Sequence, residues 1–116
     1  MALKIAVKDS GKASVLVLSG HITLGEESNQ LRNRIKAELG KGKKNLVLDL
    51  GEVTRIDSAG LGTLVSGYTT ASTAGGKLKL ANLTKKFSET LAITKLVTVF
   101  EVYDSVEDAV KSFGSK

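Results

Sequence analysis

Short apolar runs along the chain alternate with segments in which apolar residues recur every three or four positions. Residues 3–7 alternate apolar and polar side chains, and residues 15–18 read VLVL, and both patterns are typical of strands. Residues 44–50 form a nearly continuous apolar run, as expected of a central strand that helices cover on both faces. The predicted strands therefore cover residues 3–7, 15–18, 44–50, 77–80 and 99–103.

Helical spacing predicts a first helix between the second and third strands. Apolar residues at intervals of four, followed by Gly40 as a C-terminal stop, place this helix at about 24–39. Thr23 and Glu26 have the spacing of a capping box, in which each side chain accepts a hydrogen bond from the other residue's backbone amide. The sequence therefore predicts that Thr23 caps this helix.

Three more helices follow at similar intervals. The second is predicted over about 58–74, a shorter third begins after Thr84, and Ser105 caps the fourth. The resulting order is β-β-α-β-α-β-α-β-α, with about five strands and about four helices. This order is typical of a mixed, mostly parallel sheet packed by helices. We expect one α/β domain over residues 1–116, with its core at about 3–113.

The composition excludes several classes of chemistry. The 116 residues include no cysteine and a single histidine, His21, so thiolate metal sites and disulfides are impossible and a catalytic triad would depend on one residue. We therefore expect no metal, no cofactor and no catalytic residue. The apolar runs are far shorter than the roughly 20 residues that span a bilayer, and the N-terminus lacks a signal-peptide pattern. The expected location is the cytoplasm, without membrane attachment.

The net charge of +5 raises the question of nucleic-acid binding. The lysines, however, gather in predicted turns and strand starts, at 41–44, 77–79 and 85–86. Only three phenylalanines and two tyrosines are available to stack on bases. Solvated turn charges explain the excess better, so no direct contact with nucleic acid is expected.

The segment DSAGLG, residues 57–62, joins the predicted central strand to the second helix. Such a junction lies at the carboxyl ends of parallel strands, where ligands and partners usually bind. Ser58 there could be a helix cap, a nucleophile or a phosphate acceptor. Gly60 and Gly62 either allow tight helix packing or leave the serine uncovered, since each glycine costs a helix up to about 1 kcal/mol relative to alanine.

The nucleophile interpretation is the weakest of the three. The hydrolase pattern G-x-S-x-G is absent because Ile56 occupies the place of its first glycine, and only His21 could serve as a base. The spacing of a phosphate-binding loop is also missing. A phosphate acceptor needs only exposure, and a phosphate on Ser58 would add roughly −1.5 to −2 charges beside Asp57. The residues alone leave the cap and the phosphate acceptor open.

The run LVLDLGEVTRIDSAGLGTLV, with VLVLSGHITL before it and GGKLKLANL after it, closely resembles the STAS domain of bacterial anti-sigma factor antagonists. The resemblance implies a non-enzymatic protein that binds an anti-sigma factor, which is also a serine-protein kinase, and so releases a sigma factor. It implies that this kinase phosphorylates Ser58 and that a PP2C-type phosphatase reverses the modification. The partner-binding residues that the resemblance implies are Asp57, Ser58, Ala59, Gly60, Leu61, Gly62 and Thr23.

Two features depart from the pattern of this family. Many relatives carry an acidic residue where this chain has Thr23, so no negative charge is expected there on the kinase-facing surface. The basic net charge is also unusual for the family. The alternative function is a STAS module that senses a nucleotide or small ligand, or serves as a subunit of a larger signalling or transport assembly; a serine hydrolase is a third class.

Overall fold

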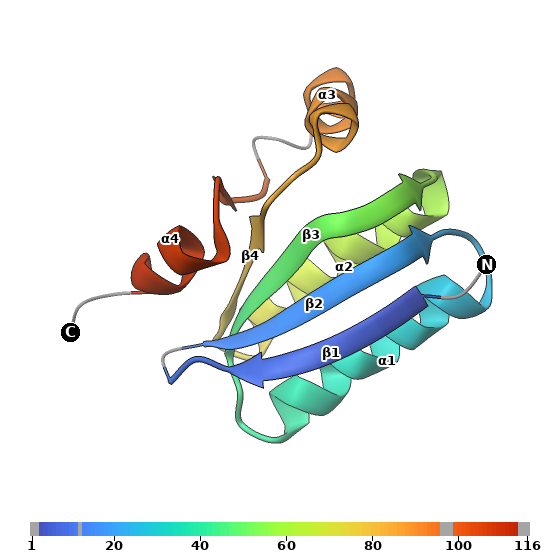
Figure 1. Cartoon of the computed structure of the whole chain (residues 1–116). Coiled ribbons are helices and arrows are strands. Elements are labelled where there is room, and N and C mark those ends of the chain that lie inside the picture. The colour runs from blue at the N-terminus through green and yellow to red at the C-terminus, as the bar shows by residue number, and fades with distance from the viewer. Residues whose placement is uncertain (1–2, 12, 96–98, 114–116) are drawn as a thin grey trace.

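The sheet arranges its five strands in the order of the chain, β1-β2-β3-β4-β5. In the computed structural model, which describes residues 3–11, 13–95 and 99–113, β1 is antiparallel to β2 and the other neighbouring pairs are parallel (Figure 1). The elements are β1 (Leu3–Asp9), β2 (Ser14–Ile22), α1 (Glu26–Gly40), β3 (Asn45–Ile56), α2 (Ser58–Thr73), β4 (Lys77–Ala81), α3 (Lys85–Thr94), β5 (Val102–Tyr103) and α4 (Val106–Lys111). This confirms the predicted α/β class and the order of the elements.

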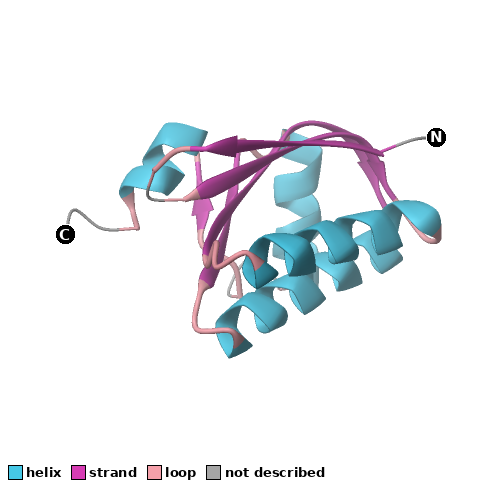
Figure 2. Ribbon diagram, turned by 90° about the horizontal axis from the view of Figure 1, so that it is seen from below, coloured by secondary structure: helices cyan, strands magenta, loops and turns pink. Residues whose placement is uncertain are grey.

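The helices form layers on the two faces of the sheet. α1 and α2 lie together along one face, and α4 lies on the opposite side near one end (Figure 2). Leucines of β2, β3 and β4 point toward α1 and α2 and form the main core, which also takes in Phe87 and Leu91 of α3. The alternate residues of the same strands, such as Val15 and Val47, pack with Ala109 of α4 in a smaller cluster. Burial on both faces explains the near-continuous apolar sequence of β3.

β3 is longer than predicted, because residues 51–56 continue the strand instead of forming a loop. Two register shifts between β2 and β3 mark bulges, which add residues to β3 and bend it. The bulges break the alternation of polar and apolar residues. The sequence GEVTRI therefore resembles a loop, although it pairs with β2 as a strand. As a result, β3 ends level with Ile22, the last residue of β2.

β4 stops pairing with β3 early. The last paired residues are Asp49 and Ala81, and the next residue, Asn82, has a φ of 58°. This left-handed conformation is one that asparagine adopts more readily than most residues, and it turns the chain away from the sheet. The Asn82 side-chain amide donates to Asp49 Oδ1 at 3.1 Å, and that oxygen also accepts from Gly51 N at 3.1 Å. The second half of β3 therefore extends beyond β4 (Figure 1).

The predicted cap of the first helix and the predicted extent of the last strand were also wrong. The expected capping box at Thr23 does not form, because α1 begins at Glu26 behind Gly25, which makes no side-chain cap. Gly25 has a φ of 106°, a conformation open mainly to glycine. The last strand covers only Val102–Tyr103 instead of 99–103, because Phe100 turns into the core and packs edge-on against Tyr68.

A buried lysine fixes the C-terminal helix to the sheet. Lys79 of β4 is only 3% exposed, and its Nζ donates to Ser112 Oγ at 2.7 Å. The same ammonium lies 4.2 Å from the ring centroid of Phe113 and 3.2 Å from Glu101 Oε1. Cation–π attraction is strongest where the cation is desolvated, so Lys79 holds the segment after α4 against the sheet.

Replacing Lys79 by alanine is expected to lower the free energy of unfolding by about 2 kcal/mol, since it removes a buried hydrogen bond and a desolvated cation–π contact. Urea unfolding measures the change, and hydrogen exchange should show faster opening of residues 106–113. Lys77→Ala on the same strand is the control, because Lys77 is exposed and its loss should change stability by less than about 0.5 kcal/mol. Equal effects of the two substitutions would contradict this role for Lys79.

Candidate partner-binding site at the start of helix α2

Asp57 caps α2 and connects the ends of two neighbouring strands. Its backbone is extended, and its Oδ1 accepts from Gly60 N at 2.9 Å, satisfying one of the free amides at the start of the helix. Its Oδ2 accepts from Leu24 N at 3.0 Å, in the loop that follows β2. Its own amide donates to Ile22 O at 3.3 Å. One residue thus holds the β2–α1 loop against the start of α2.

The hydrogen bonds from Gly60 and Leu24 also lower the pKa of the Asp57 carboxyl group below its ordinary value, because they favour the charged form. The carboxylate is therefore ionised at neutral pH, and each of its two oxygens accepts one backbone hydrogen bond. This arrangement makes Asp57 a supporting residue for the site.

Gly60 and Gly62 have different structural roles. Gly60 is buried, and a Cβ atom placed on it would lie 2.1 Å from Ile22 O and 2.8 Å from Ile56 Cγ1. Only glycine lets α2 approach the end of β2 this closely. A Cβ on Gly62 would meet no atom within 4 Å, and Gly62 is exposed. Of the two glycines, Gly60 serves tight packing and Gly62 leaves the surface beside Ser58 uncovered.

Ser58 is the first residue of α2 and is exposed. Its hydroxyl makes no hydrogen bond with the part of the chain that the structure describes, since Asp57 provides the cap. Ala59 beside it is half-buried. Leu61 is only 8% exposed and belongs to the core, so it anchors the start of α2 to the domain. The serine thus stands on a fixed surface that a second protein can reach.

Thr23 and Leu24 supply the other side of this surface. Thr23 is half-buried, and its carbonyl oxygen accepts from Ser28 Oγ at 2.8 Å, which fixes the loop before α1. Leu24 is 77% exposed although it is a large apolar residue. The sequence alone does not point to Leu24, because its place in this surface depends on the long-range hydrogen bond from its amide to Asp57. We name Thr23, Leu24 and residues 57–62 the α2 face.

The position of His21 bears on the nucleophile interpretation of Ser58. It lies on β2 opposite Arg55 of β3, and within the described residues no hydrogen bond joins it to Ser58. The described residues also contain no group of histidine and acidic side chains that could hold a metal ion. None of the described helices has the length and apolar character needed to span a membrane.

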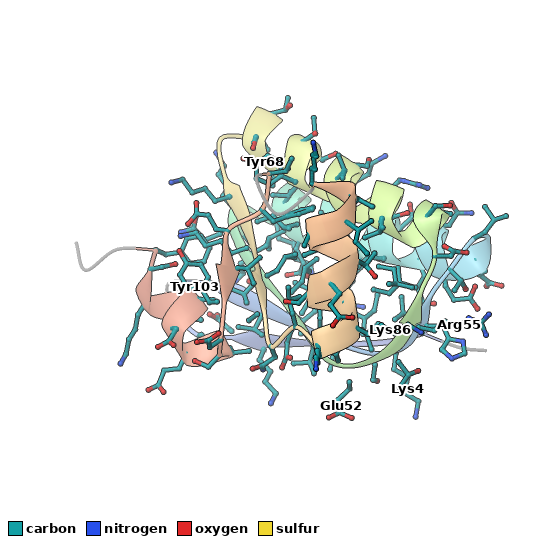
Figure 3. All side chains as sticks on the ribbon, turned by 90° about the horizontal axis from the view of Figure 1, so that it is seen from above. Lys4, Glu52, Arg55, Tyr68, Lys86 and Tyr103 are labelled. Carbon is teal, nitrogen blue, oxygen red and sulfur yellow. The ribbon has the colours of Figure 1, made fainter. Side chains whose placement is uncertain are left out.

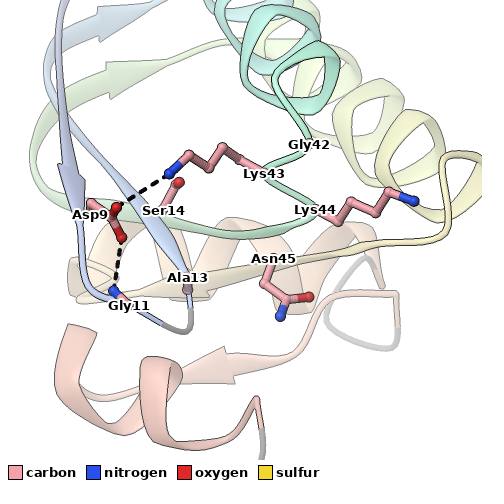
Figure 4. Close-up of a pocket in the computed structure, with 8 residues that line it drawn as sticks. All are labelled: Asp9, Gly11, Ala13, Ser14, Gly42, Lys43, Lys44 and Asn45. Carbon is pink, nitrogen blue, oxygen red and sulfur yellow. Dashed lines mark hydrogen bonds and ion pairs between the residues drawn. The ribbon is translucent and has the colours of Figure 1, made fainter.

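Most of the turn lysines lie at the opposite end of the parallel strands. There the β1–β2 hairpin and the α1–β3 loop surround a polar pocket of about 280 Å³ (Figure 4). Lys43 pairs with Asp9 at 3.2 Å, and Asp9 Oδ1 also accepts from Gly11 N. These contacts account for part of the positive charge within turns. The prediction of solvated turn charges was wrong for Lys79, which is buried within β4, and Lys85 and Lys86 form the first turn of α3. The pocket is lined by Asp9, Gly11, Ala13, Ser14, Gly42, Lys43, Lys44 and Asn45.

Gly60→Ala and Gly62→Ala form a matched pair on one helix. Gly60→Ala should destabilise the protein by at least about 2 kcal/mol, because its Cβ would collide with backbone. Gly62→Ala should stabilise it by up to about 1 kcal/mol through higher helix propensity. Thermal and urea unfolding of both variants measure the difference. A Gly60→Ala protein as stable as the parent would show that α2 can move away from Ile22 without cost.

The substitution Asp57→Asn tests whether the ionised Asp57 carboxylate stabilises the fold, because that stabilisation should depend on pH. The pKa of Asp57 is lower in the folded than in the unfolded chain, so its stabilisation is present above the unfolded value of about 3.9 and is lost as pH falls further. The parent should be more stable than Asp57→Asn at pH 7, and this difference should shrink steadily between about pH 5 and pH 2. Melting temperatures of both proteins across this range measure it, and a constant difference would rule out the proposed titration.

Comparison with known proteins identifies the family of this chain. The model of the STAS domain family matches residues 4–109. A protein of Thermotoga neapolitana is 32% identical over 73 residues, which cover 63% of this chain and 65% of that protein. BtrV of Bordetella bronchiseptica is 31% identical over 86 residues, 74% of each chain. Both are named "putative anti-sigma factor antagonist".

A solved structure extends the likeness to nearly the whole fold. The crystal structure of a protein of Thermotoga maritima with the same name superposes with a TM-score of 0.86 at 24% identity, covering 94% of this chain and 93% of that one. The family model spans β1 to α4, and so includes the α2 face. The chain therefore belongs to the STAS domain family, within its group of anti-sigma factor antagonists.

Proposed function

We propose that this protein is a partner-switching anti-sigma factor antagonist whose unphosphorylated α2 face binds an anti-sigma factor that is also a serine kinase. Binding releases the sigma factor from that kinase. Phosphorylation of Ser58 ends the interaction, and a PP2C-type phosphatase restores it. The protein itself carries out no catalysis in this scheme and works in the bacterial cytoplasm.

The observation that supports this proposal is the exposed Ser58 hydroxyl on a surface fixed by Asp57 and Gly60. A kinase can reach such a hydroxyl without unfolding the domain. The positive end of α2 would stabilise the added phosphate by about 0.3–1 kcal/mol, so the fold should survive the modification. The switch would then act on the interface alone.

The phosphate would oppose binding through charge and desolvation. It would add roughly −1.5 to −2 charges next to the ionised Asp57 carboxylate. A partner that packs closely over neutral Ser58 would have to remove water from this anion, which costs several kcal/mol per ion unless a cation compensates. Since each 1.4 kcal/mol changes affinity tenfold, this cost is large enough to release the partner.

The test begins with capture of an anti-sigma factor by the purified chain from lysate of its native organism. Incubation of the two proteins with ATP should place one phosphate on Ser58, identified by mass spectrometry, and Ser58→Ala should abolish it. Ser72→Ala is the matched control, because Ser72 is exposed at the far end of the same helix. Phosphate on Ser72, or no phosphate with a bound kinase, would contradict the proposed switch.

Ser58→Asp should keep the melting temperature within about 2 °C of the parent and weaken binding to the captured anti-sigma factor at least tenfold. The physical reason is that even one added charge must be desolvated on docking. Calorimetry of the parent, Ser58→Asp and Ser58→Ala measures this, with Ser58→Ala expected to bind like the parent. Tight binding by Ser58→Asp would argue against exclusion by charge.

A further inference from the structure

The second half of β3 has a strand neighbour on one side only. β2 pairs with β3 as far as Ile56, whereas β4 pairs with it only as far as Asp49. The turn at Asn82 carries the chain out of the sheet, and among the described residues no strand follows β3 along residues 50–56 on that side. An open edge of this kind presents backbone N–H and C=O groups that another extended chain can pair with.

A pocket of about 290 Å³ lies between this part of β3 and helix α3. We name it the β3–α3 groove. Its base contains the buried ring of Phe87, and Thr90 lines it from the next turn of α3. From β3 it is lined by Thr54 and Arg55, and at its end by Asp57, the residue before Ser58. The groove therefore runs directly into the α2 face.

The groove carries positive charge on both walls. Arg55 of β3 and Lys86 of α3 are both exposed and both line it, and Figure 3 shows them on the same side of the molecule. Neither side chain forms an ion pair with any described residue. Among the described lining residues, Asp57 is the one carboxylate, and it already accepts hydrogen bonds from two backbone amides. An acidic side chain placed in the groove would therefore find unpaired cations.

We propose that an extended segment of the anti-sigma factor, bearing an acidic side chain, binds in the β3–α3 groove as an added strand on β3. This inference rests on the proposed function and adds a second contact beside Ser58. Backbone groups on the open side of residues 52–56 would pair with the segment, and Arg55 and Lys86 would bind its acidic group. A helix fits these groups less well, because its backbone hydrogen bonds are already satisfied internally.

Crosslinking can locate the segment, because the chain has no cysteine of its own. Thr54→Cys and Thr90→Cys place a single thiol in the groove, and Ser88→Cys places one on the exposed surface of α3 outside the groove lining. Each variant is labelled with benzophenone maleimide, mixed with the captured anti-sigma factor and irradiated. Labels at 54 and 90 should crosslink to one short segment that contains Asp or Glu, at least tenfold more efficiently than the label at 88.

Charge reversal provides a second measurement. Arg55→Glu with Lys86→Glu should weaken binding to the same anti-sigma factor about tenfold at low salt and less at high salt. Lys85→Glu is the control, because Lys85 is exposed on α3 and does not line the groove. Its affinity should stay within about twofold of the parent, and melting curves verify that all variants are folded.

The outcomes separate the two proposals. Suppose that an anti-sigma factor binds and phosphorylates the parent. If it then crosslinks equally at positions 54, 88 and 90, or is insensitive to the double charge reversal, the groove proposal is contradicted and the proposed phosphorylation switch is not. Crosslinks to a helix or to a segment without acidic residues also overturn it. If the parent captures no anti-sigma factor, both proposals fail.

Discussion

The close approach of α2 to the end of β2 is the constraint on which the site depends. Gly60 permits it, because any side chain there would collide with Ile22 O, and Asp57 holds it through two backbone amides on different segments. Both contacts use main-chain atoms of their partners, so they fix the backbone without depending on the side chains at Leu24 or Ile22. Ser58 is thereby presented from the ends of regular elements, which position a functional group more rigidly than loops do.

This constraint also separates supporting residues from exposed ones within a six-residue motif. Three residues of the motif contact the rest of the domain. Asp57 caps α2, Gly60 allows the close approach to β2, and Leu61 packs in the core. Ser58 and Gly62 face solvent. Rigidity and accessibility therefore come from different residues of the same turn of helix. The phosphate proposed for Ser58 would alter the exposed surface without breaking a hydrogen bond, because the described residues form none with that hydroxyl.

The element order and fold class could be predicted because both helix and strand periodicities are strong in this chain. The helices at 26–40 and 58–73 agree closely with the predicted ranges of 24–39 and 58–74. The errors arose where tertiary contacts override local pattern, as in the bulged extension of β3 and the Phe100 turn into the core. The Thr23 cap failed because Gly25 supplies a conformation that the local motif did not indicate.

Part of the candidate site could likewise be predicted from the sequence, and part could not. The DSAGLG motif identified Ser58 and its neighbours because they are contiguous in sequence. Leu24 and the groove between β3 and α3 could not be found, since they depend on contacts over 33 residues and on the path of the chain after Asn82. The contrast between Gly60 and Gly62 likewise requires knowing which atoms lie nearby.

The arrangement of the sheet in chain order bears on how the domain folds. Because each strand lies beside its predecessor in sequence, every new strand docks onto an edge that the preceding part of the chain has already provided. A hairpin joins β1 to β2, and one helix each joins β2 to β3 and β3 to β4, which keeps the entropy lost in closing these loops small. The strand order is therefore compatible with assembly that adds each later strand to the edge of the N-terminal hairpin.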